Sequence, residues 1–328
     1  MISHRFRIAG VLAAAAIVVG GCTAAATPSP TVAPTVAPTV APTTAPGATT
    51  APTPTAAPTQ VLVATVAPDE LVVPGHLTIC SDIPYPPQEF FDANGNPTGS
   101  DIDIGTEIAN RLGLKVAVQN TVFDTIIAAL DGNKCDIIIS AQNITPDRLK
   151  QVDMIPYFEA GQSFVVAAGN PAAINTTNDL CGKKVAAETG TTEVDYLQGT
   201  GAYKGQGLSA ACTSKNLAAI NIKSFGKDSD ALLALQSGQV DAYFADSPVA
   251  GYYTVQHPDQ FALSGIAPLQ PAFEGISVTQ ANTGLRDAVQ QALVGMINDG
   301  TYLTILKKYG DDSGAVTAAD AQTLNKLK

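Results

Sequence analysis

The sequence lacks an apolar run long enough to cross a membrane as a helix, and it is short of basic residues. A spanning helix needs ~20 apolar residues, and the stretch IAGVLAAAAIVVGG, from Ile8 to Gly21, is shorter than that. Lys and Arg together number 18 against 29 for Asp and Glu, which gives a formal net charge of -11. All the acidic residues follow residue 68. An acidic surface there argues against nucleic acid and anionic lipid as partners.

Residues 1–21 are expected to be an export signal. His4, Arg5 and Arg7 precede the short apolar run, and small residues end it, which is the layout of a secretory signal. The run ends in VGGC, residues 19–22, which resembles a bacterial lipobox, the motif whose cysteine is lipid-modified and becomes the new amino terminus. We therefore predict a lipid anchor at Cys22. An ordinary signal followed by a chance cysteine is the alternative.

Residues 22–68 are predicted to be a disordered tether that starts at the lipidated cysteine. The segment Thr23–Pro68 repeats TVAP three times between residues 31 and 42 and contains no charged residue. Such a composition cannot bury enough apolar surface to fold. Regularly spaced proline favours extended polyproline II, so the tether would reach up to ~140 Å at ~3.1 Å per residue.

Residues 69–328 are too many for one small core and suggest two lobes. They contain four cysteines, Cys80, Cys135, Cys181 and Cys212, whose spacings do not fit a zinc site. An even number of cysteines in an exported protein favours disulfides. We expect the local pairs Cys80–Cys135 and Cys181–Cys212, each within one lobe; four free, buried thiols are the alternative.

The order of predicted elements is typical of a parallel α/β sheet. The segments LTIC (77–80), LKVAV (114–118) and DIIIS (136–140) indicate strands, with helices over 101–112 and 123–132 between them. Ser100 or Asp101 is expected to cap the first helix, and Thr145 a helix after the third strand. Ligands of such sheets lie outside the carboxyl ends of the strands. Three loops meet there: residues 81–85, the segment before Phe123, and SAQNITPDR (140–148).

A second unit of the same kind begins near Lys183. The segments KKVAA (183–187), INIKSF (220–225) and VDAYFA (240–245) indicate strands. Between them, ETGTTEVDYL indicates a tight loop and the start of a helix, and DSDALLALQSG indicates a helix. GISV (275–278) indicates a strand, and the helical tail 282–310 follows it, so the last part of the chain is expected to return to the first lobe. We predict lobe 1 as residues 69–161 and 269–328, and lobe 2 as residues 162–268. The two crossings between the lobes would lie near 159–163 and 268–273.

Seven stretches, in this order and spacing, resemble the extracellular solute-binding proteins of polar amino-acid ABC transporters. They are SDIPYPPQEF, GSDIDIGTEIANRLGLKV, FDTIIAALDGNKCDIIIS, ITPDR, DLCGKKVAAETGTTEVDYL, ALLALQSGQVDAYFADSPV and INDGTYLTILKKYG. The likeness covers nearly all of residues 69–311. It implies a two-lobed, periplasmic-binding-protein-like α/β fold with two parallel-sheet lobes joined by a two-strand hinge. It also implies that a free amino acid binds between the lobes, with no cofactor and no metal.

The resemblance further implies roles for individual residues. Arg148 would clamp the α-carboxylate, because a guanidinium offers planar paired donors. Asp246 would accept the α-ammonium, and Asp82 would bind the side chain. The remaining implied ligand-binding residues are Ser140, Ala141 and Asn143 near the clamp, Gly190, Thr191 and Thr192 in the TGTT loop, Tyr85 and Phe123 as apolar walls, and Glu188. The alternatives are a surface arginine for Arg148 and a helix cap for Asp246.

Two departures from the family pattern bear on the ligand. Asn143 stands where a small hydroxyl residue is usual, and Glu188 stands where glutamine is common. A buried, ionised Asp82 needs a donor. A guanidinium or ammonium supplies a full charge, whereas an amide supplies only two neutral donors. We therefore expect a cationic amino acid such as arginine, lysine or ornithine ahead of glutamine.

These features predict the monomeric substrate-binding component of an ABC importer, not an enzyme. It would be lipid-anchored to the outer face of the cytoplasmic membrane and would deliver its ligand to the transmembrane subunits of the permease. A ligand that touches both lobes would stabilise their closed form. One alternative is a dehydratase acting on prephenate or arogenate, with Glu188 as proton donor; His4, His76 and His257 all lie outside the motifs. The other is a ligand-sensing lipoprotein that acts through a receptor partner.

Overall fold

The computed structural model describes residues 63–328, so the predicted signal, Cys22 and most of the predicted tether lie outside the described residues. The last predicted tether residues belong to the folded part. Ala64 and Val66 pack against a hydrophobic core, and the N–H of Val63 donates to the carbonyl oxygen of Arg111 (3.1 Å). Ordered packing therefore begins before Asp69.

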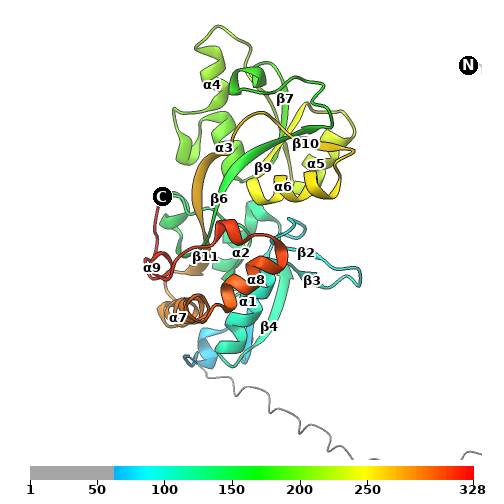
Figure 1. The fold of residues 1–328 in the computed structure, drawn as a ribbon. Coiled ribbons are helices and arrows are strands. Elements are labelled where there is room, and N and C mark those ends of the chain that lie inside the picture. Colours follow the sequence, from blue (N-terminus) through cyan, green and yellow to red (C-terminus); the bar gives the residue numbers. More distant parts are fainter. Residues whose placement is uncertain (1–62) are drawn as a thin grey trace, which may run out of the picture. The chain divides into compact units, whose positions relative to one another are not determined.

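Lobe 1 is built from the first and last thirds of the described chain (Figure 1). Its strand β1 (His76–Ser81) pairs in parallel with β4 (Lys115–Asn120) and with β5 (Ile137–Ile138). The helices are α1 (Ser100–Arg111), α2 (Ile126–Asp131), α7 (Thr283–Asp299), α8 (Thr301–Tyr309) and α9 (Ala318–Ala321), and a small hairpin joins β2 (Phe90–Phe91) to β3 (Pro97–Thr98). The tail helices α7 and α8 pack in lobe 1, as expected from the sequence.

Lobe 2 repeats the same construction with the middle of the chain. Strand β7 (Lys184–Glu188) pairs in parallel with β8 (Asn221–Phe225) and with β9 (Ala242–Asp246). The helices are α3 (Thr192–Gln198), α4 (Leu208–Thr213), α5 (Asp228–Gln236) and α6 (Ser247–Gln256), and the short strand β10 (Phe261–Leu263) lies against β6 (Val152–Ala167). The carboxyl ends of β7 and β9 carry Glu188 and Asp246.

Two long strands, β6 and β11 (Leu269–Thr279), run between the lobes and form the hinge. They pair antiparallel, with Gln162 opposite Leu269 and Glu159 opposite Phe273. The chain therefore passes between the lobes twice, once in β6 and once in β11. β11 also pairs with β5, and β6 with β9, both antiparallel. The parallel strands of the two lobes are therefore joined through the hinge strands into one ladder, in the order β4-β1-β5-β11-β6-β9-β7-β8.

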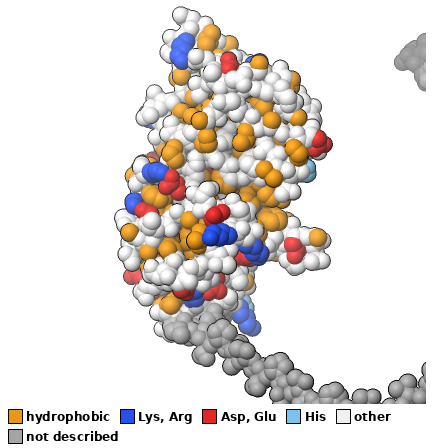
Figure 2. Space-filling model, in the orientation of Figure 1, with side chains coloured by type: hydrophobic (Ala, Val, Ile, Leu, Met, Phe, Trp, Pro, Cys, Tyr) orange, Lys and Arg blue, Asp and Glu red, His pale blue; other side chains and the backbone are white. Residues whose placement is uncertain are grey.

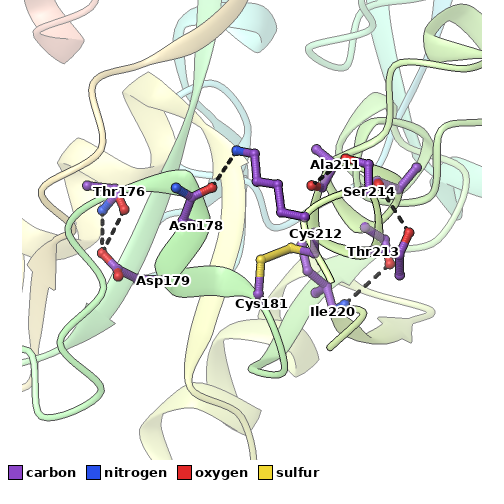
Figure 3. The surroundings of a disulfide bond; sticks show 12 residues. Thr176, Asn178, Asp179, Cys181, Ala211, Cys212, Thr213, Ser214 and Ile220 are labelled. Carbon is purple, nitrogen blue, oxygen red and sulfur yellow. Dashed lines mark hydrogen bonds between the residues drawn. A yellow bond between two sulfur atoms is a disulfide. The ribbon is translucent and has the colours of Figure 1, made fainter. Parts of the chain in front are cut away.

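Both expected disulfides are present. Cys80 of β1 is bonded to Cys135, just before β5, and both sulfur-bearing residues are buried. Cys181 is bonded to Cys212 of α4 (Figure 3). In the adjoining turn, Asp179 accepts a hydrogen bond from the backbone N–H of Thr176 (2.8 Å). Each bridge stays inside one lobe, so neither restrains the hinge.

Two predicted helix caps are wrong. The residue before α1 is Gly99, and Asp101 is fully buried, where its carboxylate accepts from the Tyr157 hydroxyl (2.7 Å) and the Ala141 N–H (3.0 Å). The predicted helix after the third strand is a single 3-10 turn, Arg148–Lys150. The Thr145 hydroxyl does accept from the Arg148 N–H (3.3 Å), but no α-helix follows.

On the face shown in Figure 2, acidic and basic side chains are interspersed. Among residues 63–328, no helix combines the length and the apolar character that crossing a membrane requires.

Candidate functional site

A small cavity of about 20 Å³ lies between the two lobes, at the carboxyl ends of β1, β5, β7 and β9. Every ligand-binding residue predicted from the sequence lines it except Gly190. Its lining consists of Asp82, Tyr85, Glu89, Phe123, Ser140, Ala141, Asn143 and Arg148 from lobe 1, and Glu188, Thr191, Thr192, Glu193 and Asp246 from lobe 2. The fold thus brings together residues that are far apart in the sequence.

The lobe 1 wall is organised by Ser140, which lies two residues after the end of β5. Its hydroxyl accepts a hydrogen bond from the Asp82 N–H (2.9 Å) and donates to a carboxyl oxygen of Glu89 (2.7 Å). The Asp82 carboxylate in turn accepts from the Phe123 N–H (2.6 Å). One Asp82 oxygen is therefore satisfied by the backbone, and the group is held at the cavity edge.

Arg148 reaches across the cavity rather than outward to solvent. Its guanidinium donates to the carbonyl oxygens of Asn143 (2.8 Å) and, in lobe 2, of Gly190 (3.1 Å). The guanidinium carbon lies 5.2 Å from the centre of the Phe123 ring, which places the cation over an aromatic face. Burial lowers the pKa of Arg148, although the carboxylates of Glu193, Asp195 and Asp246 oppose that shift. The surface-arginine alternative is wrong.

The TGTT loop brings lobe 2 against this wall. The Thr192 hydroxyl donates to the Asn143 side-chain oxygen (2.5 Å) and accepts from the Gln162 amide (2.8 Å). Gly190 has a φ of +83°, which glycine adopts without strain. A Cβ built on Gly190 would lie 2.9 Å from the Asp124 Cα in lobe 1, so the two lobes meet here at backbone distance.

Asp246 occupies the residue before α6, but its side chain makes no capping hydrogen bond. One carboxyl oxygen accepts from the Tyr85 hydroxyl of lobe 1 (3.0 Å), and the same hydroxyl accepts from the Asp246 N–H (2.9 Å). Among residues 63–328, the other oxygen is buried without a hydrogen-bond partner. Burial, together with the nearby charges of Glu193 and Glu274, raises the pKa of Asp246 well above its usual range. The helix-cap alternative for Asp246 is not what this geometry shows.

Glu188, the unusual acid of the family pattern, faces the cavity and is 7% exposed. Burial, with the nearby charges of Asp228 and Asp82, raises the pKa of Glu188 to about 10. Burial also raises the pKa of Asp82. Glu188 therefore holds a proton at neutral pH unless a cation enters the cavity, because a positive charge favours the ionised form.

Sequence reasoning missed two acids, Glu89 and Glu193. Burial raises the pKa of both, and each has one buried carboxyl oxygen without a hydrogen-bond partner. Glu193 directly follows the TGTT loop in the sequence, and that position could have identified it. Glu89 lies in the turn-rich segment after β1, where no periodicity shows which side chains point inward.

The cavity therefore combines one guanidinium with five carboxyl groups. Arg148 can bind a carboxylate through paired donors. In their ionised form, the unpartnered oxygens of Glu89, Glu188, Glu193 and Asp246 accept hydrogen bonds from donors, and a cation in the cavity would favour that form. This arrangement fits a small molecule that carries one carboxylate and at least one cationic group.

Comparisons with known proteins agree with this geometry. The family described as bacterial extracellular solute-binding proteins, family 3, matches residues 77–312. The L-cystine-binding protein of Escherichia coli (strain K12) is 27% identical over 236 residues, which cover 72% of this chain and 82% of that protein. ABC transporter arginine-binding protein 1 of the same organism is 30% identical over 226 residues, covering 67% and 85%.

Among solved structures, an ancestral arginine-binding protein bound to arginine is 36% identical, with a TM-score of 0.63. The match covers 72% of this chain and 98% of that chain. A structure of an ancestral arginine-binding protein bound to glutamine matches with the same identity and a TM-score of 0.64, covering 72% and 97%.

Proposed function

Because the chain belongs to the bacterial extracellular solute-binding proteins of family 3, we propose that it captures a free amino acid between its lobes and delivers it to the permease of an ABC importer. The observation that carries this proposal is the single guanidinium among five carboxyl groups in the cavity between the lobes. A zwitterion needs one group of each sign at a fixed spacing. Arg148 and Asp246 supply them from opposite lobes, so the ligand would hold the lobes together.

The α-groups of the ligand account for Arg148 and Asp246. The carboxylate would take over the guanidinium donors that now reach the carbonyl oxygens of Asn143 and Gly190. The hydroxyl of Thr192, at 3% exposure, would assist it from lobe 2. The ammonium would meet the unpartnered oxygen of Asp246. Each bond is charge-assisted, which is the strong class of hydrogen bond in a desolvated site.

The side chain of the ligand would be cationic. After the α-groups are paired, Asp82 and Glu188 remain, together with Glu89 and Glu193. Buried carboxylates are costly without a positive partner. The Asp82 carboxylate already accepts a hydrogen bond from the Phe123 N–H, so at that one position the amide of glutamine is favoured over a cationic group. Glutamine would, however, leave Glu188 without a positive partner. The side chain of arginine, lysine or ornithine supplies the positive charge that these remaining acids lack.

A calorimetric titration of the purified protein tests both levels of the proposal. Arginine, lysine and ornithine are expected to bind more tightly than glutamine, and Asp82→Asn should narrow that gap. If glutamine binds tenfold more tightly and Asp82→Asn has no effect, the ligand is a neutral amino acid. If none of the amino acids binds, the amino-acid-binding function itself is wrong.

The dehydratase alternative rests on Glu188, whose raised pKa leaves a proton on an acid at the cavity wall. A binding protein returns its ligand unchanged, whereas a dehydratase releases water and, from prephenate or arogenate, carbon dioxide. Incubation with prephenate and with arogenate, followed by mass spectrometry, separates the two functions. We favour binding because the named relatives are binding proteins. A sensing role through a receptor partner would show as normal ligand binding without an uptake defect on deletion.

We also propose that the protein is a monomer anchored by lipid at Cys22 to the outer face of the cytoplasmic membrane. The lipobox-like VGGC motif supports the anchor. Mass spectrometry of the purified wild-type protein should find the lipid on Cys22, and Cys22→Ser should appear in the medium or stay unprocessed. A wild-type protein without lipid would contradict the anchor and leave the binding function untouched.

A further inference from the structure

The last residues of the chain lie along the hinge. The segment 315–328, called the C-terminal strap here, begins where Ala315 pairs with Phe158 of β6 and continues through α9 to Lys328. Figure 1 shows it running from α9 beside the hinge strands. The family match ends at residue 312, so the family model does not account for the strap. No strap residue lines the ligand cavity.

Two kinds of contact anchor the strap to lobe 1 and to β6. Val316 and Ala321 are buried in the core of lobe 1. Further along, the N–H of Asn325 donates to the Met154 carbonyl oxygen (2.8 Å), and the Asn325 side-chain oxygen accepts from the Met154 N–H (2.7 Å). The Asn325 amide also donates to Asp153 (2.9 Å). At Met154 the strap therefore binds both backbone polar groups of the hinge strand.

Two lysines carry the strap over the point where the hinge leaves lobe 1. Glu159 of β6 and Phe273 of β11 lie opposite each other in the ladder. Lys328 forms an ion pair with Glu159, and its Nζ lies 6.0 Å from the centre of the Phe273 ring. The Nζ of Lys326 lies 5.1 Å from the same ring and pairs with Asp320 of α9. The strap thus contacts both hinge strands at one position of the ladder through ionic and cation–π contacts.

The hinge becomes irregular directly beyond this position, on the lobe 2 side. The pairing of β6 with β11 shifts register between Leu269 and Ala272. Gln270, inside this gap, has a φ of +47°, and Pro271 has no N–H to donate. Gly161 stands opposite the gap in β6, and glycine restricts the backbone least. The position held by the strap therefore borders a weakly paired section, where bending of the hinge costs least.

We propose that the C-terminal strap is a hinge clamp, which fixes the lobe 1 end of β6 and β11 so that the lobes bend only at the irregular section beside Gly161. This inference rests on the proposed closure of the lobes around a ligand and adds a segment that controls it. A clamped hinge leaves the ligand-free protein fewer orientations of lobe 2, so less conformational entropy is lost on closure. The closed fraction is then larger, and the apparent ligand affinity is higher.

The test variant combines Lys326→Met with Lys328→Met, which removes both charges and keeps the length of the chain. Hydrogen exchange of the ligand-free protein measures the clamp directly, because amides exchange when the structure around them opens. Peptides covering residues 156–163 and 268–276 should exchange about fivefold faster or more, since a partly exposed ion pair or cation–π contact changes an equilibrium about two- to fivefold and both kinds are lost. Calorimetry should show the affinity for L-arginine reduced about two- to fivefold.

Lys308→Met is the matched control. Lys308 also combines an ion pair, with Asp103 (2.6 Å), and a cation–π contact, with Tyr309 (4.7 Å), but these partners belong to α1 and α8 and not to the hinge strands. It should leave exchange at the hinge unchanged. Lys326→Arg combined with Lys328→Arg should behave as the wild-type protein does, because arginine keeps the charge and also stacks on aromatic rings.

The outcomes separate this inference from the proposed function. Unchanged hinge exchange in the double methionine variant, or an equal increase in Lys308→Met, overturns the clamp and leaves amino-acid binding intact. Faster exchange throughout lobe 1 also overturns it, because the strap would then contribute only general stability. Faster hinge exchange with unchanged affinity for arginine overturns the control of closure. If the wild-type protein binds no amino acid, the proposed function is wrong, and exchange at the hinge still decides whether the strap clamps β6 and β11.

Discussion

Arg148 is the residue on which the binding argument depends most. It is the one cation in the cavity lining, and both hydrogen bonds of its guanidinium go to backbone carbonyl oxygens, one in each lobe. Carbonyl oxygens are neutral acceptors, so a ligand carboxylate can replace them with a net gain. Phe123 supports the guanidinium from one face and leaves its edge available.

We predict that Arg148→Ala abolishes amino-acid binding while leaving the fold intact. Removing one partner of a buried ion pair leaves the ligand carboxylate unpaired, which costs on the order of 3–5 kcal/mol. Calorimetry measures the affinity, and circular dichroism checks the fold. Arg286→Ala is a suitable control, since Arg286 pairs with Asp153 (2.9 Å) and Asp287 (2.7 Å) outside the cavity. Near-normal affinity in Arg148→Ala would remove this residue from the site.

The sequence predicted site residues where a motif ends a strand and missed them elsewhere. The rule for parallel sheets pointed to the loops that hold Asp82 and Ser140, which follow strands. Glu188 and Asp246, which end strands in lobe 2, came from the family resemblance. Neither Glu89 nor Asp228 belongs to a recognisable sequence motif. Their inward direction depends on the packing of a loop and of α5, which no local periodicity encodes. Sequence-based reasoning therefore found the rim of the site and missed its inner acids.

At the scale of elements, the TGTT loop and the short 3-10 turn Phe123–Thr125 bring the two lobes into close approach. Gly190 contributes no side chain, so its backbone can lie against Asp124. The Tyr85–Asp246 and Thr192–Asn143 hydrogen bonds close the same seam on either side. Closure of the cleft therefore depends on this loop as well as on the ligand.

We predict that Gly190→Ala weakens ligand binding by preventing full closure. The added Cβ would lie 2.7 Å from an Asp124 carboxyl oxygen and 2.9 Å from the Asp124 Cα, and the backbone atom cannot give way cheaply. A smaller closed fraction lowers the apparent affinity in proportion, so we expect a loss of about tenfold or more. Small-angle scattering should show less compaction on adding arginine.

Gly205→Ala separates this clash from backbone strain. Gly205 has nearly the same φ, +82°, and a Cβ there would meet nothing within 4 Å. Both variants bear the cost of a left-handed alanine, ~1–2 kcal/mol. Only Gly190→Ala should lose compaction. Equal losses of affinity in the two variants would show that the approach of the lobes at Gly190 has no special role.

Helices and strands were predicted correctly where the apolar pattern is strong. Predictions failed where side-chain hydrogen bonds determine how a helix begins or whether it forms. The parallel strands follow from apolar runs and glycine positions, and both disulfides from the even number and local pairing of the cysteines. The cap expected at Asp101 fails because Tyr157 and Ala141 offer that carboxylate better partners inside the core. In place of the helix expected after Thr145 there is a single 3-10 turn, because the chain enters strand β6 at Val152.

For the molecule as a whole, buried acids dominate the electrostatics. Burial raises the pKa of Asp101 to about 6, of Asp311 to about 7 and of Asp228 to about 8. In the unfolded chain these groups titrate near ~4. The folded protein therefore binds more protons than the unfolded chain between about pH 4 and pH 8. Under that condition the free energy of unfolding falls as pH rises.

We predict that the ligand-free protein is more stable at pH 5 than at pH 8. Each carboxyl group with a raised pKa lowers the free energy of unfolding by up to ~1.4 kcal/mol per pH unit as the pH rises from its unfolded to its folded pKa value. Asp299 and Asp320, whose pKa values are lowered to about 2 by Arg111 and Lys326 among other partners, lose their contribution only below about pH 4. The melting temperature, followed by circular dichroism from pH 4 to pH 8, measures the trend.

Asp311→Asn provides the internal check on this pH dependence. The amide does not titrate, so the slope between pH 4 and pH 7 should become shallower by up to one proton. Ser100 can still donate to the amide oxygen. A melting temperature that rises with pH in the wild-type protein, or an unchanged slope in Asp311→Asn, would contradict the role of the buried acids.

Because the hinge strands divide the chain into segments, they also set the order in which the two lobes can be completed as the chain is made. The buried core residues of lobe 2 all come from one continuous stretch, Phe164 to Phe261, whereas those of lobe 1 come from Leu71 to Ala160 and again from Phe273 to Ala321. A chain that emerges from its N-terminus onward delivers every core residue of lobe 2 while lobe 1 still lacks α7 and α8. Although lobe 1 begins first in the sequence, it is therefore completed last, because its hydrophobic core also needs residues of α7 and α8.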